Sequence, residues 1–405
     1  MMSQMDALRV PARLGLAGLS LILMLAAACD DSASTGDADR EELFTQGPFE
    51  VGYRELTISY DAVGSSAKRE LLLRVWYPAR DDSDAPPAIY AVADFEVVEV
   101  PAPFALDAPP VTEERGLPLA LYSHGNGGEG LLAYPYGELM ASHGWIVVAP
   151  NHTGNTALEL LRGEADPAAR VALDRPHDLT AIIDELESGL VGDELEAKAD
   201  TSRVYVFGHS FGGYTTFAAA GADVDYDALR ADCDATPTSE DCEVLADPGV
   251  EQAYRAGFGD PRVVAIAPQA PALLGMSQEQ LAQLEVPTML MTGRLDQTTT
   301  QQESAEPAWA GIDEPGDLWV EMPEGGHFSF ISICDDLAPG VLMLFQPDAE
   351  EDGCGTGFIP SAEAVPVLAA YVLAFGRRHV LGETQWDAVL MGEPLGDGFV
   401  VTLKP

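Results

Sequence analysis

Basic residues are scarce in this sequence. Its 405 residues include 21 lysines and arginines but 66 aspartates and glutamates, which gives a formal net charge of −45 at pH 7. So negative a surface repels the phosphates of nucleic acids and the head groups of anionic lipids, and we therefore exclude nucleic-acid binding. High salt screens the repulsion between acidic side chains, so the composition favours a protein from a saline environment.

The sequence also lacks the bias of disordered and fibrous chains. Hydrophobic residues make up 47% of it and charged residues 21%, a composition that can bury a sizeable core. The length alone would allow two or three domains. Because we find no internal repeat and no second pattern of elements, we predict a single folded domain over residues 48–405 and expect a monomer.

The apolar run at the N-terminus is too short for a comfortable transmembrane helix. Leu14–Ala28 holds 15 residues, whereas a spanning helix needs about 20. Arg9 and Arg13 precede the run and three alanines end it, which is typical of a secretory signal peptide. Cys29 follows the alanines directly, so the segment resembles the lipobox of bacterial lipoproteins, with Ala26 in place of the usual leucine.

The lipobox resemblance implies that residues 1–28 are removed and that Cys29 is lipidated, which would anchor an exported protein to a membrane, in the periplasm or at the cell surface. The alternative is an ordinary signal peptide with a chance cysteine, which would give a secreted protein. Residues 29–47 are acidic, small and unpatterned, and we predict that they form a disordered tether after the lipidated cysteine.

Cysteine is rare as well. Four of the five cysteines remain after Cys29, and an even number in an exported protein suggests two disulfides, with three possible connectivities. Pairing between sequence neighbours, Cys233–Cys242 and Cys334–Cys354, is the simplest, with free buried thiols as the alternative. The cysteines lack the CxxC spacing of zinc sites. We expect no metal and no cofactor.

Strand and helix patterns alternate along most of the chain. Strands are predicted at 50–62, 69–78, 118–123, 145–149, 203–207, 262–267, 287–292 and 318–322, and helices at 131–143, 176–190, 211–220, 278–284 and 361–375. Near-continuous apolar strands that alternate with helices predict an α/β fold whose mostly parallel sheet is covered by helices on both faces. Residues 80–116 are expected to form an excursion between strands, and 222–260 an acidic insertion.

The stretch Gly208-His209-Ser210-Phe211-Gly212 fits the pattern G-x-S-x-G. It directly follows a predicted strand and opens a predicted helix, which is the strand–turn–helix setting of a nucleophilic serine. The flanking glycines allow a tight, strained turn that exposes Ser210, and the helix N-terminus favours developing negative charge. We predict that Ser210 is a nucleophile; the alternative is a capping serine at a glycine-rich helix start.

A nucleophilic serine needs a base, which in this setting comes last in the order Ser, acid, His. Only His327 and His379 follow Ser210. His379 lies at a predicted helix end, where a cation caps the helix dipole. His327 lies in a glycine-rich loop just after the last predicted parallel strand, and we favour it as the base.

The acid that orients the base is predicted from its place after a strand. Asp296 follows the strand 287–292 and can accept a hydrogen bond from the imidazole, which holds its tautomer. Its rivals are Asp313 and Asp317, and the alternative role for Asp296 is that of a loop residue that solvates a turn.

The loop His124-Gly125-Asn126-Gly127-Gly128 follows the strand 118–123. Its glycines let backbone N–H groups converge on an oxyanion, and we predict the Asn126 N–H and the Phe211 N–H as the two donors. His124 is expected to brace the loop. Residues 222–260 and 273–284 are expected to overhang Ser210 and to form an apolar acyl pocket.

Several stretches resemble, in the same order, one α/β-hydrolase family, the predicted dienelactone hydrolases related to platelet-activating-factor acetylhydrolase. They are Tyr122–Gly128, Ala141–Trp145, Ala149–His152, Arg175–Asp178, Gly208–Tyr214 and Gly326–Phe330. The resemblance covers residues 51–381 and implies an α/β-hydrolase fold and a calcium-independent serine esterase for short or oxidised acyl esters, including those of phospholipids. Ser210 and His327 match the nucleophile and base of the family, and Asn126 and Phe211 match its oxyanion positions.

Two positions depart from that family. The acetylhydrolases take their acid from the end of the preceding strand, where this chain has Pro268-Gln269, so the acid role passes to Asp296. True dienelactone hydrolases use a cysteine where this chain has Ser210. We therefore expect a serine carboxylic-ester hydrolase that acts on a small-molecule or lipid ester through an acyl-enzyme. The alternatives are a serine peptidase or amidase on the same fold, and a non-catalytic surface lipoprotein that binds lipid or polymer.

Overall fold

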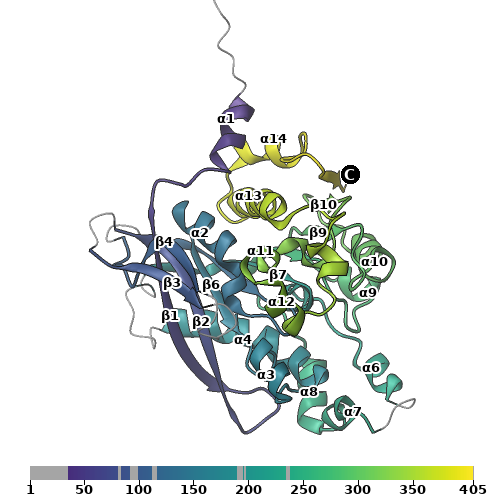
Figure 1. Cartoon of the computed structure of the whole chain (residues 1–405). Coiled ribbons are helices and arrows are strands. Elements are labelled where there is room, and N and C mark those ends of the chain that lie inside the picture. The colour runs from purple at the N-terminus through teal and green to yellow at the C-terminus, as the bar shows by residue number, and fades with distance from the viewer. Residues whose placement is uncertain are drawn as a thin grey trace, which may run out of the picture.

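The computed structural model describes residues 35–80, 84–91, 99–111, 116–188, 195, 198–233 and 238–404. The predicted signal peptide and the predicted lipidation at Cys29 lie outside these residues. A single sheet of 11 strands runs through the molecule in the order β11-β10-β9-β8-β7-β5-β6-β2-β1-β4-β3 (Figure 1). The strands are Glu50–Asp61 (β1), Lys68–Ala79 (β2), Pro87–Ala91 (β3), Glu99–Leu106 (β4), Leu117–Ser123 (β5), Ile146–Asn151 (β6), Ala199–His209 (β7), Val263–Gln269 (β8), Met289–Gly293 (β9), Leu318–Met322 (β10) and Val400–Leu403 (β11).

The middle of the sheet is parallel. Strands β6, β5, β7, β8, β9 and β10 all run in one direction, and β2 and β11 pair antiparallel to its two sides. The helices are Thr35–Glu42 (α1), Tyr134–Ser142 (α2), Ala157–Arg162 (α3), Ala168–Ser188 (α4), Phe211–Ala219 (α5), Tyr226–Asp232 (α6), Glu240–Leu245 (α7), Pro248–Ala256 (α8), Gln278–Leu281 (α9), Glu306–Gly311 (α10), Ile333–Asp336 (α11), Pro339–Phe345 (α12), Ser361–His379 (α13) and Asp387–Leu390 (α14).

Helices cover both faces of the parallel strands. In β7, Tyr205 and Phe207 belong to the apolar core that includes α2 and α13, whereas Val204 and Val206 belong to the core that includes α4 and α5. All side chains of β7 from Val204 onward are buried, which explains why this strand has an unbroken apolar sequence. The predicted α/β fold with a mostly parallel, doubly covered sheet is confirmed.

The structure corrects the prediction for residues 80–116. The predicted excursion between strands itself contains two strands, β3 and β4, which extend the sheet beyond β1. The prolines Pro87, Pro101 and Pro103 hid the strand pattern. Proline is tolerated near the edge of a sheet: Pro87 lies in the edge strand β3, and β4 pairs with β1 only at Ala105 and Leu106, so Pro101 and Pro103 remove no bond to β1.

The prediction of a disordered tether up to residue 47 is wrong for residues 35–47. These include α1, which lies beside α14 in Figure 1, and Leu43, which is buried in the core. The guanidinium of Arg40 donates to the carbonyl of Glu393 at 2.7 Å, and Arg377 forms an ion pair with Glu42. Tertiary contacts of this kind, rather than local helix propensity, stabilise so short and polar a helix.

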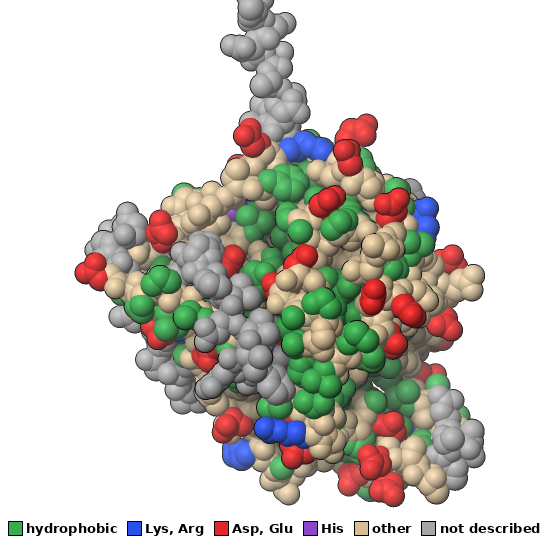
Figure 2. All heavy atoms as spheres, viewed as in Figure 1, with side chains coloured by type: hydrophobic (Ala, Val, Ile, Leu, Met, Phe, Trp, Pro, Cys, Tyr) green, Lys and Arg blue, Asp and Glu red, His purple; other side chains and the backbone are tan. Residues whose placement is uncertain are grey.

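Both predicted disulfides are present in the structure. Cys233–Cys242 joins α6 to α7 inside the acidic insertion, and Cys334–Cys354 closes the segment between α11 and α13. Acidic side chains are scattered over the face shown in Figure 2, where basic ones are few. Across the described ranges, no helix combines the length and the apolar character that membrane crossing requires.

Candidate active site

Ser210 occupies the turn between β7 and α5. Its φ is +58° and its ψ is −115°, a conformation that non-glycine residues rarely adopt. The turn requires glycine two residues before and two residues after Ser210: an added Cβ would meet the carbonyl oxygen of Ser123 at 1.8 Å on Gly212 and at 2.6 Å on Gly208. The predicted strand–turn–helix geometry around Ser210 is therefore the geometry observed.

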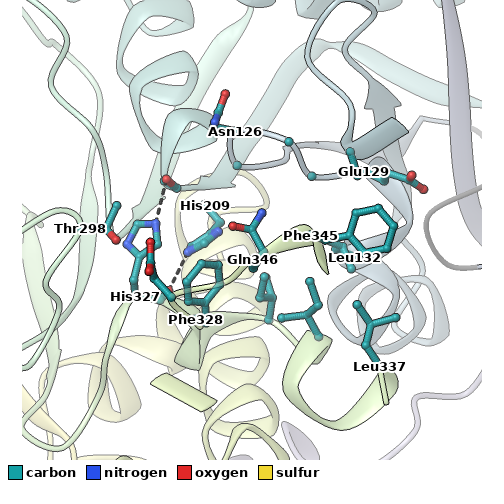
Figure 3. Close-up of a pocket in the computed structure, with 18 of the residues that line it drawn as sticks. Asn126, Glu129, Leu132, His209, Thr298, His327, Phe328, Leu337, Phe345 and Gln346 are labelled. Atoms are coloured by element: carbon teal, nitrogen blue, oxygen red, sulfur yellow. Dashed lines mark hydrogen bonds between the residues drawn. The ribbon is translucent and has the colours of Figure 1, made fainter. Parts of the chain in front are cut away.

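The structure brings Ser210, His327 and Asp296 together at the carboxyl ends of β7, β9 and β10. The Oγ of Ser210 lies 2.9 Å from Nε2 of His327, a bond drawn as a dashed line at His327 in Figure 3. Nδ1 of His327 lies 2.9 Å from Oδ2 of Asp296. The N–H groups of Thr298 and Thr299 donate to Oδ1 of Asp296 at 2.8 and 2.6 Å. In this arrangement the Nδ1–H donates to the carboxylate, which leaves Nε2 free to accept the hydroxyl proton.

The rival residues lie elsewhere. Asp317 accepts hydrogen bonds from the N–H groups of Thr288 and Glu314, at the amino-terminal ends of β9 and β10. Asp313 is exposed in the loop before β10. His379 ends α13, where its ring packs against Phe375.

The oxyanion loop, which we define as His124–Gly128, packs directly against Ser210. An added Cβ on Gly125 would lie 3.2 Å from Cβ of Ser210. Among the described residues, the N–H groups of Asn126 and Phe211 have no hydrogen-bond acceptor. For Phe211 this is usual, because it is the first residue of a helix. The side chain of Asn126 accepts a hydrogen bond from Asn155 and turns away from His327 (Figure 3), so only its backbone faces the nucleophile.

Buried side chains brace the oxyanion loop. The Arg175 guanidinium donates to the carbonyl oxygens of His124 and Gly125 at 2.6 and 3.1 Å, and the N–H of His152 donates to Nε2 of His124 at 3.0 Å. Burial lowers the pKa of Arg175 to about 9 and lowers the pKa of His124 well below its usual value, so the histidine is neutral. His124 therefore braces the loop, with partners that its sequence context does not reveal.

A second Ser–His–Asp arrangement lies behind this loop. Ser123 Oγ is 2.9 Å from Nε2 of His152, whose Nδ1 is 2.7 Å from Oδ2 of Asp178. Arg69 forms an ion pair with Asp178 at 2.6 Å, and Tyr60 donates to the same carboxylate. The three side chains of this second arrangement are fully buried. Ser123, His152 and Asp178 lie in stretches that the family resemblance includes, but no sequence pattern predicts that their side chains form hydrogen bonds with one another.

His209 supports His327 from behind. Its Nε2–H donates to the carbonyl oxygen of His327 at 2.8 Å, and the two rings are in contact. Burial, reinforced by the neighbouring imidazole of His327, lowers the pKa of His209 to about 3. His209 is therefore neutral near pH 7 and holds the His327 backbone as a hydrogen-bond donor.

A cavity of ≈ 230 Å³ opens at Ser210 and His327. Its apolar walls come from residues 131–132 and from the segment 328–345. Polar side chains also line it, among them Glu129, Thr298, Gln346 and Asp348. Figure 3 shows Leu132, Leu337 and Phe345 grouped at the end far from His327, with Gln346 between. The apolar lining residues are Leu131, Leu132, Ala157, Phe328, Ile331, Ile333, Leu337 and Phe345.

The expected cover of Ser210 by residues 222–260 and 273–284 is wrong, because none of the residues described in these two segments lines the cavity. The insertion forms α6, α7 and α8, and the last two pack on α4. The wall comes from α11 and α12 instead, in the segment that the Cys334–Cys354 disulfide closes. The sequence contained one signal for this, a pair of cysteines just downstream of the base.

Comparisons with known proteins agree with the fold. Residues 89–231 match the family model described as Chlorophyllase, a segment that includes Asn126 and Ser210 but ends before Asp296 and His327. No curated protein matches the chain. A solved ferulic acid esterase from Streptomyces cinnamoneus is similar with a TM-score of 0.61 and 24% identity, over 88% of this chain and 97% of that one. The chain has the α/β-hydrolase fold.

Proposed function

We propose that this protein is a serine carboxylic-ester hydrolase in which Ser210 is the nucleophile, His327 the base and Asp296 the orienting acid. The observation that carries the proposal is the continuous hydrogen-bonded chain from Asp296 through His327 to Ser210, which ends in a cavity. The names of the matched family and of the structural neighbour support it, since the neighbour is an esterase. That the acyl ester is short or lipid-like, as in the acetylhydrolase resemblance, is the finer part of the proposal.

The geometry supports a two-step reaction. Nε2 of His327 takes the proton of Ser210 as Oγ attacks the ester carbonyl carbon, and the N–H groups of Asn126 and Phe211 stabilise the oxyanion. The C–O bond to the alcohol then breaks, and the alcohol leaves with the proton from His327. Water attacks the acyl-enzyme by the same route, which releases the acid and restores Ser210.

The cavity favours esters with an apolar group of moderate size. Its far end is formed by aliphatic and aromatic side chains, among them Leu132, Leu337 and Phe345, and apolar area that leaves water there contributes binding energy. An anionic acyl or alcohol group would lose its hydration in this cavity without a cationic partner, because the lining includes the carboxylates of Glu129 and Asp348 and no lysine or arginine from the ranges that the structure describes.

We propose further that the protein is exported and anchored through a lipid on Cys29. The two disulfides support export, since disulfides persist in oxidising compartments. Radioactive palmitate fed to cells that produce the full chain should label it, and the label should be lost in Cys29→Ala. Labelling that persists in Cys29→Ala would contradict the anchor.

The test of the hydrolase is a series of p-nitrophenyl esters from acetate to laurate, with protein that starts at Asp30. We expect hydrolysis that Ser210→Ala lowers by about 10⁴-fold or more, with Ser188→Ala, an exposed serine at the end of α4, as the matched control. Equal rates in wild type and Ser210→Ala would contradict the proposal. Cleavage of peptidyl amides without cleavage of any ester would favour the peptidase alternative, and no cleavage at all would favour the binding protein.

A further inference from the structure

Asp352 is a buried carboxylate beside the triad with no partner of opposite charge in its hydrogen-bond set. Its Oδ1 accepts hydrogen bonds from the N–H of His327 at 2.9 Å and from the N–H of Gln297 at 3.0 Å. Its Oδ2 accepts from the hydroxyl of Thr298 at 2.8 Å. Only 2% of the side chain is exposed. One carboxylate thus contacts both the loop that bears Asp296 and the loop that bears His327.

The backbone around Asp352 packs closely against the loop that bears His327. An added Cβ on Gly326 would lie 2.6 Å from the carbonyl carbon of Asp352, and one on Gly353 would lie 2.8 Å from the nitrogen of Phe328. Gly353 has a φ of +135°, which favours glycine. The two segments therefore touch backbone to backbone, so the position of the Asp352 carboxylate relative to His327 is closely defined.

We propose that Asp352 is a positioning residue that holds the acid loop and the base loop in register. The inference rests on the proposed function, because it concerns the alignment of His327 with Asp296 and Ser210. The acid and base belong to separate loops after β9 and β10. Besides the Asp296–His327 bond, Thr299 Oγ1 lies 3.2 Å from Nδ1 of His327, and the Leu295 N–H donates to the Gly325 carbonyl at 2.9 Å. Asp352 adds two backbone bonds that fix both loops, and a misplacement of about 1 Å in such a site can cost about 100-fold in rate.

Asp352 also links the triad to the substrate cavity. It lies two residues before Cys354, in the segment that the Cys334–Cys354 disulfide closes, and that segment carries Leu337 and Phe345 of the cavity wall. The same segment therefore shapes the cavity and sets the position of the base, which places a bound ester at a fixed distance from the aligned triad.

The test compares Asp352→Ala with Asp352→Asn. The alanine variant loses all three bonds, and we expect kcat to fall about 100-fold with KM within a factor of about three. In Asp352→Asn, the amide oxygen still accepts both N–H bonds and the amide nitrogen faces the Thr298 hydroxyl, so kcat should stay within about fivefold of wild type. Equal kcat in Asp352→Ala and wild type, or a rise in KM without a fall in kcat, would overturn the proposal.

A matched control separates positioning from a loss of stability. Asp317 is also a buried carboxylate that accepts two backbone N–H bonds, but at the opposite ends of β9 and β10. Asp317→Ala should therefore lower the melting temperature as Asp352→Ala does, yet leave kcat unchanged. If Asp352→Ala does not fold, Asp352→Glu replaces it: a methylene group displaces the carboxylate, so kcat should fall at unchanged KM, and a wild-type kcat would overturn the proposal.

A spectroscopic measurement decides the proposal without any substrate. The proton between His327 Nδ1 and Asp296 Oδ2 should give a far-downfield proton resonance, which Asp296→Ala identifies by removing it. This resonance should be lost or broadened in Asp352→Ala and retained in Asp352→Asn and Asp317→Ala. Its retention in Asp352→Ala would overturn the role of Asp352, whereas a wild type that cleaves no ester would overturn the proposed function alone.

Discussion

Two Ser–His–Asp arrangements lie on opposite sides of the oxyanion loop, and they have nearly the same hydrogen-bond geometry. In the triad at the cavity, Ser210 lies 2.9 Å from His327, and His327 lies 2.9 Å from Asp296. In the buried arrangement behind the loop, the corresponding distances are 2.9 and 2.7 Å. Distances between the three side chains therefore do not distinguish a reactive serine from a structural one.

What differs is the surroundings of each serine. Ser210 has a strained backbone, borders the cavity, and is followed by a helix whose first N–H group has no acceptor in the described part of the chain. Ser123 ends a regular strand and is fully buried, and its set is completed by an ion pair between Asp178 and Arg69. Under the proposed function, access to a cavity and N–H groups without an acceptor are what distinguish Ser210 from Ser123.

The largest expected difference between the two arrangements is in activity. Asp296→Asn preserves the shape of the site but favours the wrong imidazole tautomer, so we expect kcat to fall about 10⁴-fold, the size of the effect in serine proteases. Asp178→Asn acts on the buried arrangement and should lower kcat less than about tenfold. Ester hydrolysis by the two purified variants measures both. Equal losses in the two would remove the functional distinction between the arrangements.

The second prediction concerns stability, for which we expect Asp178 to matter more than Asp296. Asp178→Ala removes the closer of the two carboxylates that pair with the buried Arg69 and leaves only Asp174 at 3.4 Å, so the free energy of unfolding should fall by about 3 kcal/mol. Asp296→Ala leaves no buried cation unpaired and should cost distinctly less. Urea denaturation followed by fluorescence measures both, and a larger loss in Asp296→Ala would contradict the structural role of the buried arrangement.

The smallest expected effect is the pH dependence of the stability that the buried histidines contribute. Burial lowers the pKa of His152 and of His124 well below the usual value, so both rings stay neutral in the folded protein as the pH falls from 8 to about 5. In the unfolded chain they take up protons below about pH 6.5, so their contribution to stability is present above that pH and decreases below it, by at most about 1.4 kcal/mol per pH unit for each.

The measurement for the third prediction is an NMR titration of the histidine ring protons, with His152→Gln for assignment. The resonances of His152 and His124 should not move between pH 8 and 5. A titration of either ring with a midpoint near 6.5 would show that the buried arrangement exchanges protons with solvent, contrary to our interpretation.

The sequence predicted the parts of the molecule that have a local pattern. The inner strands are buried on both faces and therefore have runs of apolar residues. Gly208 and Gly212 flank the turn at Ser210 because a Cβ at either position would clash with the carbonyl oxygen of Ser123. The order of serine, acid and base along the chain then restricted the choice to a few residues. His327 and Asp296, predicted in this way, are the ones the structure brings to Ser210.

Features that depend on distant partners could not be predicted. The strands β3 and β4 are rich in proline, and α1 is stabilised by contacts with the C-terminal part of the chain. Asp352 lies in an acidic stretch whose composition is that of an exposed loop, and only the fold brings it to His327. The cavity wall was assigned to the wrong segment because the sequence does not show on which side of Ser210 the insertion packs.

The most direct test of the central claim is chemical labelling of the nucleophile. An alkyl fluorophosphonate, which reacts with activated serines, is added to the folded protein, and the labelled residue is located by mass spectrometry of a digest. We predict a single adduct on Ser210, none on Ser123, and a rate of labelling at least about 100-fold lower in His327→Ala. An adduct on another serine, or equal labelling in wild type and His327→Ala, would contradict the assignment of Ser210 as the activated nucleophile.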